Sequence, residues 1–305
     1  MDFLPSIAIS PLQQLNGPWL EQFGVNVWLK RDDLLHLQVS GNKWRKLKYN
    51  LIAAHQQGYR RLLTFGGAYS NHLYATAAAG KLFGFDTIGI VRGNEHTPTT
   101  NPTLRFCADC GMELIFVSRT SYRQPDELAK RYGESCYVLP EGGTNSLAYK
   151  GLSELMDEIY TELNPDYVCV PVGTGGTVTG ICRAAQGFTK VLGFSVLKDG
   201  NGFSLAHIQH LVGTQLQDWD LMLETDQSPR GIWVGDYHCG GYAKTTPELL
   251  SFIRLFETQH GILLEQVYTG KMLFGLYDMI RKGVFKHGST IVAVHTGGLQ
   301  GRKLE

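Results

Sequence analysis

The feature that most constrains the fold is a regular alternation, from about residue 45 onward, of short β-branched runs with longer segments of helical period. Strands that alternate with helices in this way predict an α/β protein with a largely parallel sheet. The predicted strands are 62–65, 87–91, 113–117, 136–139, 167–172, 191–196 and 290–295. The predicted crossover helices, each with apolar residues three or four apart, are 43–57, 71–83, 103–109, 147–163 and 176–188.

The section 198–236 carries the weakest pattern, with one predicted helix near 205–211 and a polar stretch around 224–230. No internal repeat, low-complexity tract or Pro/Ser-rich linker marks a domain boundary. Any division into two domains must therefore come from the fold itself.

Charge and cysteine usage narrow the class of function. The chain has 28 basic and 28 acidic residues, so it lacks the positive excess typical of proteins that bind nucleic acid or an anionic membrane. A small molecule is the expected partner. Six scattered cysteines, several in apolar runs, are typical of reduced thiols in a cytosol. No signal peptide or membrane span is apparent, and we expect a cytoplasmic protein.

Glycine-rich segments follow four of the apolar strands, at 65–72, 140–145, 171–177 and 295–301. Because ligands of open α/β sheets bind outside the carboxyl ends of the strands, these loops are expected to line one cleft. The best phosphate cradle is 173–177, since it leads into a helix whose first amides favour an anion. It comprises Gly173, Thr174, Gly175, Gly176 and Thr177.

A tight turn without a ligand is the plain alternative for this loop. A dinucleotide fingerprint fails, because Val178 stands at its third glycine position and no acidic residue ends the next strand. No phosphate loop of the form G-x-x-x-x-G-K-[ST] occurs in the chain.

Lys43 lies in the segment 40–47, where Ser40 or Asn42 can cap the helix that follows. A lysine in so basic a segment is usually solvated. Neighbouring cations can nevertheless lower its pKa, which increases the fraction of the neutral amine that reacts with an aldehyde. The run 70–72 opens a helix after a strand, and either binds an anion such as a substrate carboxylate or simply caps that helix. Ser70 has no G-x-S-x-G context, so a hydrolase triad is not supported. The pair Cys107 and Cys110 lacks the further ligands of a zinc site, and buried thiols are the favoured interpretation.

Six ordered motifs together resemble the 1-aminocyclopropane-1-carboxylate (ACC) deaminase/D-cysteine desulfhydrase family, fold-type II pyridoxal 5′-phosphate (PLP) enzymes similar to the tryptophan synthase β subunit. The resemblance covers nearly the whole chain. Its motifs are 29–33, 40–47, 66–72, 173–177, 261–271 and 295–298.

The resemblance implies a role for each matching position. Lys43 carries the Schiff base to PLP, Asn71 lies against the ring and the 3′-oxygen, and residues 173–177 hold the phosphate. Ser70, Asn71 and His72 meet the substrate carboxylate, and Ser70 is also a proton relay. Tyr242 and Tyr268 approach the substrate, with Tyr268 in a catalytic role, while Thr296 lies near the pyridine nitrogen.

Two departures favour D-cysteine desulfhydrase within the family. ACC deaminases resemble one another in having Ser-Asn-Gln and Val-Tyr-Glu where this chain has Ser-Asn-His72 and Val-Tyr-Thr269. A carboxylate near the pyridine nitrogen would keep it protonated and make PLP a strong electron sink, whereas threonine hydroxyls cannot. The weaker sink suits α,β-elimination of D-cysteine to pyruvate, ammonia and sulfide. The alternative activity is that of an ACC deaminase. An alternative substrate for the elimination is another β-substituted amino acid, such as a D-serine derivative.

The resemblance also implies two α/β domains with PLP between them: a smaller one, 46–145, inserted into a larger one formed by 1–45 and 146–305. It further implies a homodimer. Two hypotheses from other classes remain at this stage: a PLP-binding protein without this turnover, and a nucleotide- or phosphosugar-binding module in which Lys43 is an ordinary surface residue.

Overall fold

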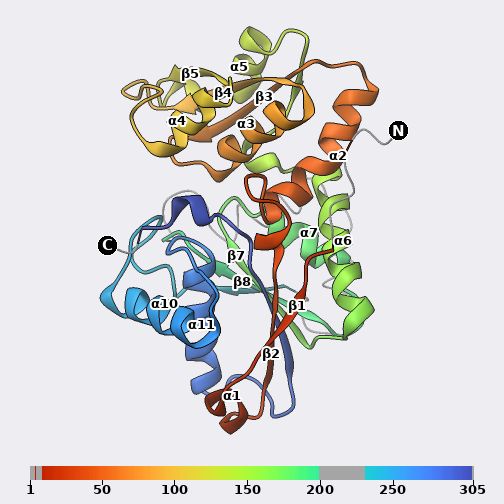
Figure 1. The fold of residues 1–305 in the computed structure, drawn as a ribbon, viewed down its shortest axis with the longest axis vertical. Helices are drawn as coiled ribbons and strands as arrows, with labels where there is room; N and C mark the ends of the chain where they lie inside the picture. Colours follow the sequence, from red (N-terminus) through yellow and green to blue (C-terminus); the bar gives the residue numbers. More distant parts are fainter. Residues whose placement is uncertain (1–3, 5–8, 199–230, 304–305) are drawn as a thin grey trace. The chain divides into compact units, whose positions relative to one another are not determined.

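The computed structural model describes Leu4, residues 9–198 and residues 231–303 of the 305-residue chain. It forms two compact α/β units, one from Leu4 and Leu35–Gly151 and one from Ile9–Leu34 with the described residues after Gly151 (Figure 1). The sequence placed the boundaries of the smaller domain at 46 and 145. Residues 42–56 form one continuous helix whose Trp44 and Leu47 pack in this unit's core, so the whole helix belongs to the compact unit, and the domain boundaries stay predictions.

The smaller unit has a four-stranded sheet of order β5-β4-β3-β6, parallel throughout. Its strands are β3 (Arg61–Gly67), β4 (Asp86–Arg92), β5 (Glu113–Val117) and β6 (Cys136–Val138). Its helices are α2 (Asn42–Gln56), α3 (Asn71–Phe83), α4 (Pro102–Asp109), α5 (Pro125–Tyr132) and the first turns of α6 (Ser146–Glu162).

Both faces of this sheet are covered, which is why its strands read as nearly continuous apolar runs. Successive residues of a strand point to opposite faces. Leu62 accordingly packs with Ala75 and Ala78 of α3, while Leu63 packs with Leu128 of α5.

The larger unit has a six-stranded sheet of order β1-β2-β10-β7-β8-β9, in which only the β1–β2 pair is antiparallel. Its strands are β1 (Leu12–Leu15), β2 (Asn26–Lys30), β7 (Tyr167–Val172), β8 (Lys190–Ser195), β9 (Gly231–Val234) and β10 (Thr290–Val294). Its helices include α1 (Pro18–Gln22), α7 (Gly176–Ala184), α10 (Pro247–His260) and α11 (Thr269–Arg281).

Alternation again sorts the core into two layers. Cys169 of β7 joins a cluster with Ile253 of α10 and Met272 of α11. Its neighbours Val168 and Val170 join a second cluster with Ile181 of α7. The predicted α/β class with mostly parallel sheets is confirmed.

Each element predicted between residues 43 and 196, and the strand predicted at 290–295, has an observed counterpart, whereas α5, β9, α10 and α11 were not predicted. Helix 71–83 and strands 113–117 and 167–172 have the predicted bounds. Helix α7 ends at Ala184 rather than at 188, because Ala185 is already extended and Gly187 has φ +56°. The predicted helix 205–211 lies outside the described residues. No helix of the described part combines the length and apolar character that crossing a bilayer requires.

Candidate active site

Lys43 is the second residue of α2 and stands at the start of the smaller unit's first long helix. The sequence predicted that Ser40 or Asn42 caps this helix, and that prediction was wrong. The N-cap is Gly41, with φ +63° and no side-chain cap, so the chain enters the helix through a backbone conformation that suits glycine. Ser40 contributes its carbonyl oxygen, which accepts the amide hydrogen of Lys43 at 3.3 Å.

The side chain of Lys43 is partly buried, and desolvation of its amine lowers the pKa to about 8. No carboxylate of the described residues forms an ion pair with it. The sequence interpretation attributed a lowered pKa to neighbouring cations. Desolvation is the cause at Lys43, whereas the like charge acts on Lys46.

Lys46, one turn along α2, is 1% exposed and was not singled out from the sequence. Its Nζ donates to the carbonyl oxygen of Gly142 at 3.0 Å and to Oγ1 of Thr144 at 3.2 Å. Burial and then the charge of Lys43 hold the pKa of Lys46 well below its usual value. The i, i+3 spacing of two lysines at a helix start was the available signal.

Ser70 is the N-cap of α3, as one of the two sequence interpretations had it. Its Oγ accepts the amide hydrogens of His72 and Leu73, both at 3.2 Å. The hydroxyl hydrogen of Ser70 is therefore left to donate elsewhere. Asn71 follows as the first residue of the helix, so the cap and the expected carboxylate site coincide at one helix N-terminus.

The imidazole of His72 is buried, 2% exposed, and turned toward the sheet. Thr64 donates its hydroxyl to the carbonyl oxygen of Leu139, so it accepts a hydrogen from Nε2 of His72 at 2.9 Å. Nδ1 is then an acceptor, and it has no hydrogen-bond partner. Burial, followed by the charges of Lys43 and Lys46, holds the pKa of His72 well below its usual value, so the ring is neutral.

In the larger unit, the segment 173–175 joins the carboxyl end of β7 to the start of α7. Gly175 is the N-cap, with φ +83°, and no side chain caps this helix. Gly175 has no side chain that could cover the first amides of α7, and a glycine-rich helix start of this kind is suited to receive a phosphate. Thr177 lies in the first turn and is 6% exposed.

Tyr268 lies directly against this segment. A Cβ added at Gly173 would stand 3.0 Å from Cε1 and 3.4 Å from the hydroxyl oxygen of Tyr268, so glycine is needed for the ring to approach. The ring of Tyr242 meets that of Tyr268 edge to face, with centroids 6.1 Å apart. The structure therefore brings Gly173, Tyr242 and Tyr268 together within one unit.

Thr296 follows β10 and is 7% exposed, and its hydroxyl oxygen lies 3.4 Å from that of Thr269, the first residue of α11. Nearby, Glu265 is buried and caps the start of α11. Its carboxylate accepts the amide hydrogens of Val267, Tyr268 and Thr269 at 2.6–3.0 Å. Burial nevertheless raises the pKa of Glu265 to about 7. The sequence reasoning did not find this residue.

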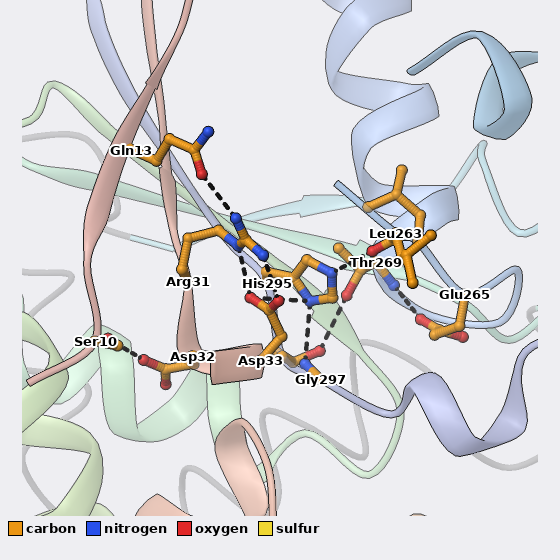
Figure 2. A network of polar contacts seen from close by, with 12 residues as sticks. Ser10, Gln13, Arg31, Asp32, Asp33, Leu263, Glu265, Thr269, His295 and Gly297 are labelled. Atoms are coloured by element: carbon orange, nitrogen blue, oxygen red, sulfur yellow. Dashed lines mark hydrogen bonds and ion pairs between the residues drawn. The ribbon is translucent and has the colours of Figure 1, made fainter. Parts of the chain in front are cut away.

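A polar network supports the residue that precedes Thr296 (Figure 2). His295 accepts the amide hydrogen of Gly297 at Nδ1, so Nε2 carries the proton and donates to the carbonyl oxygen of Leu263 at 2.8 Å. Burial lowers the pKa of His295, and the neighbouring carboxylate of Asp33, 3.9 Å away, opposes this effect in part. Arg31 in turn grips Asp33 through two hydrogen bonds of 2.9 and 2.8 Å.

Taken unit by unit, the structure groups Lys43, Ser70, Asn71 and His72 at the helix starts of the smaller unit. It groups 173–177, Tyr242, Tyr268 and Thr296 in the larger one. The residues of each unit fit a part of PLP, because an amine of lowered pKa suits its aldehyde and a glycine-rich helix start suits its phosphate. No three His, Cys, Asp or Glu side chains of the described residues gather as a metal site would require.

Comparison with known proteins defines the class. The family model for pyridoxal-phosphate dependent enzymes matches residues 4–297, and the chain belongs to that family. With its two mostly parallel sheets it is a fold-type II PLP enzyme.

More particular similarities follow within this class. The chain is 33% identical over 310 residues to a Pyrococcus horikoshii protein provisionally named ACC deaminase, covering 96% of this chain and 90% of the relative. It is 30% identical to a D-cysteine desulfhydrase of Klebsiella pneumoniae, covering 95% and 92%. A crystal structure described as an ACC deaminase homologue superposes with a TM-score of 0.80 at 30% identity, covering 98% of this chain and 92% of that one.

Proposed function

We propose that this PLP-dependent enzyme is a D-cysteine desulfhydrase, which converts D-cysteine and water to pyruvate, ammonia and hydrogen sulfide. Relatives named D-cysteine desulfhydrase and relatives named ACC deaminase match at nearly equal identity, so the choice depends on the chain's own residues. Membership of the enzyme family sets aside the nucleotide- or phosphosugar-binding module.

The observation that carries the proposal is the buried pair of hydroxyls of Thr269 and Thr296. By the family resemblance these residues face the pyridine nitrogen, where hydroxyls cannot hold a proton on the ring as a carboxylate would. The nearby carboxylate of Glu265 is already engaged by three backbone amides. Without a protonated pyridine nitrogen, the PLP ring is a weaker electron sink. A weaker sink suits a reaction in which the β-substituent leaves as soon as the α-proton is removed.

PLP, when bound, withdraws the electron pair that proton removal leaves on the substrate Cα. In the proposal, Lys43 would hold the aldehyde of PLP, and its Nζ would accept the α-proton of the substrate. Its lowered pKa, about 8, leaves a useful fraction of neutral amine near neutral pH. The amides at 173–177 hold the phosphate, with the hydroxyls of Thr174 and Thr177 beside them.

Ser70 and Asn71 meet the substrate carboxylate at the start of α3, where the hydroxyl hydrogen of Ser70 is available to donate. The imidazole of His72 is buried and hydrogen-bonded to Thr64. We therefore propose that His72 supports the start of α3 from its buried side. Tyr268 and Tyr242 approach the side chain of the substrate, and Tyr268 is suited to protonate the departing thiolate.

The experiment follows pyruvate from D-cysteine and L-cysteine, and 2-oxobutanoate from ACC, with one preparation of holoenzyme. Pyruvate from D-cysteine alone is expected. The variant Lys43→Ala should lose both turnover and the near-visible absorbance of the bound cofactor, whereas Lys48→Ala on the same helix should retain both. Release of 2-oxobutanoate from ACC without pyruvate from D-cysteine would reverse the assignment to ACC deaminase.

A PLP protein without this turnover predicts the absorbance band with no product from any of the three compounds. The homodimer and the cytoplasmic location remain predictions of the sequence analysis. Sedimentation of the holoenzyme and fractionation of the source cells test them.

A further inference from the structure

We infer that Lys271 is a positioning residue, which holds the turn 238–241 and thereby sets the ring of Tyr242 against that of Tyr268. The inference rests on the proposed function only in treating Tyr242 as a substrate-facing residue.

Lys271 is the third residue of α11 and is 1% exposed. A buried ammonium in the first turn of a helix is doubly unfavourable, because it loses its hydration and faces the positive end of the helix dipole. Burial lowers its pKa to about 8, although Glu265 and Cys239 oppose this effect. A lysine in such a place needs specific partners.

Those partners are two backbone oxygens of one turn. Nζ of Lys271 donates to the carbonyl oxygens of His238 and Gly241, each at 2.7 Å. The same two oxygens accept the amide hydrogens of Gly241, in this turn, and of Lys244, in the turn 241–244 that follows. The ammonium therefore joins both ends of the turn to α11.

The turn needs such a support, because its backbone is unusual. Cys239, Gly240, Gly241 and Ala243 all have positive φ, and two of them carry a Cβ. Non-glycine residues in this region persist only where surrounding contacts over-determine them. The segment between β9 and α10 has no helix or strand hydrogen bonding of its own to do so.

Tyr242 stands inside this run of positive φ values, directly after Gly241. Its side chain is 42% exposed, so packing holds it only in part, and its ring meets Tyr268 edge to face. Tyr268 is fixed separately, since Glu265 accepts its amide hydrogen and Gly173 lies against its ring. Lys271 thus connects the turn that carries Tyr242 to the helix that begins beside Tyr268.

The variant Lys271→Met keeps the volume and removes the donors, and Lys286→Met is the matched control at an exposed lysine beyond the same helix. In Lys271→Met holoenzyme we expect the amides of Gly241 and Lys244 to exchange with deuterium about tenfold faster or more, with the cofactor absorbance unchanged. We also expect KM for the turned-over amino acid to rise about fivefold or more, with a smaller change in kcat. Lys286→Met should match the wild type in all three.

A double-mutant cycle separates positioning from general support. In a Tyr242→Ala background, Lys271→Met should change KM little further, because its effect passes through the ring already removed. Additive effects on KM, or unchanged exchange at Gly241 and Lys244, would overturn the inference. If Lys271→Met does not fold, Lys271→Gln, which keeps a neutral amide donor group on a shorter side chain, is judged by the same exchange and KM criteria.

The exchange measurement needs no substrate, so it decides the inference even if neither cysteine nor ACC is turned over. In that case it is the proposed function that fails.

Discussion

Replacing Lys43 by methionine should make the apoprotein more stable at neutral pH while abolishing its chemistry. The ammonium of Lys43 is desolvated without a carboxylate partner among the described residues, which lowers its pKa from 10.5 to about 8. A pKa difference of one between the folded and unfolded states corresponds to about 1.4 kcal/mol, so the charged form carries a cost of about 3 kcal/mol below pH 8. Because the side chain is only partly buried, we expect a measured gain of about 1–3 kcal/mol.

The stability difference between Lys43→Met and the wild type should depend on pH. Between pH 8 and 10.5 the folded state binds fewer protons at this site than the unfolded state, so the wild type becomes more stable as the pH rises. The advantage of Lys43→Met should therefore be full at pH 7 and mostly lost by pH 10. Removal of this charge also relieves Lys46, whose pKa it helps to lower, and this acts in the same direction.

Urea unfolding of the apoproteins at pH 7 and pH 10 measures both quantities, with Lys48→Met as the control on the same helix. A gain that is absent at pH 7, or equally large at pH 10, would contradict the account of Lys43 as a desolvated, unpaired amine.

Three further predictions concern other parts of the site. Gly175→Ala places a Cβ at φ +83° and should weaken cofactor binding by about 1–2 kcal/mol in a PLP titration, whereas Gly187→Ala, also at positive φ but on an open surface, should leave it unchanged. Glu265→Gln removes a carboxyl whose pKa is about 7 in the folded protein, above its usual 4.5, so the wild type loses stability from this group as the pH rises. The free energy of unfolding of the variant, relative to the wild type, should therefore increase by about 2–3 kcal/mol between pH 5 and 8. A difference in urea midpoints that stays constant over this range would refute the prediction. Gly151→Ala would bring a Cβ to 1.8 Å from the backbone oxygen of Arg45, so we expect a loss of at least about 3 kcal/mol in thermal unfolding, and a variant as stable as the wild type would contradict this close packing of α6 on α2.

The elements that could be predicted from the sequence are those with a local signature. Strand 167–172 is a short apolar run ended by glycine, and helix 71–83 starts at a serine cap and stops at Gly84, which has φ +74°. Helix α10 carried equally clear signals in Thr246, Pro247 and Gly261, which the prediction did not use. Strands β1 and β2 are different, because only their pairing with each other and with β10 makes them strands.

The site shows the same division between local and long-range information. The cap at Ser70 and the glycine start of α7 are encoded by neighbouring residues, so the sequence could place them. The burial of His72, and its bond to Thr64, depend on the covering of both faces of the sheet and had no local signal. Lys271 likewise acquires its role from a turn 30 residues earlier in the chain.

The lysines themselves make the strongest case for the position of the reactive amine. Lys30, Lys46 and Lys271 are all nearly inaccessible, and each has oxygen partners: Glu158 and the carbonyl of Ser10, the carbonyl of Gly142, and the two carbonyls of the 238–241 turn. Lys43 shares their desolvation but has no ion-pair partner in the described part of the chain. Burial lowers the pKa of Lys46 and Lys271 as well, so Lys43 differs from them in that no oxygen of the described residues holds its amine in place. A neutral amine free of such partners can attack an aldehyde. The same lack of a partner that should make Lys43 costly for folding therefore supports the proposal that Lys43 binds the PLP aldehyde.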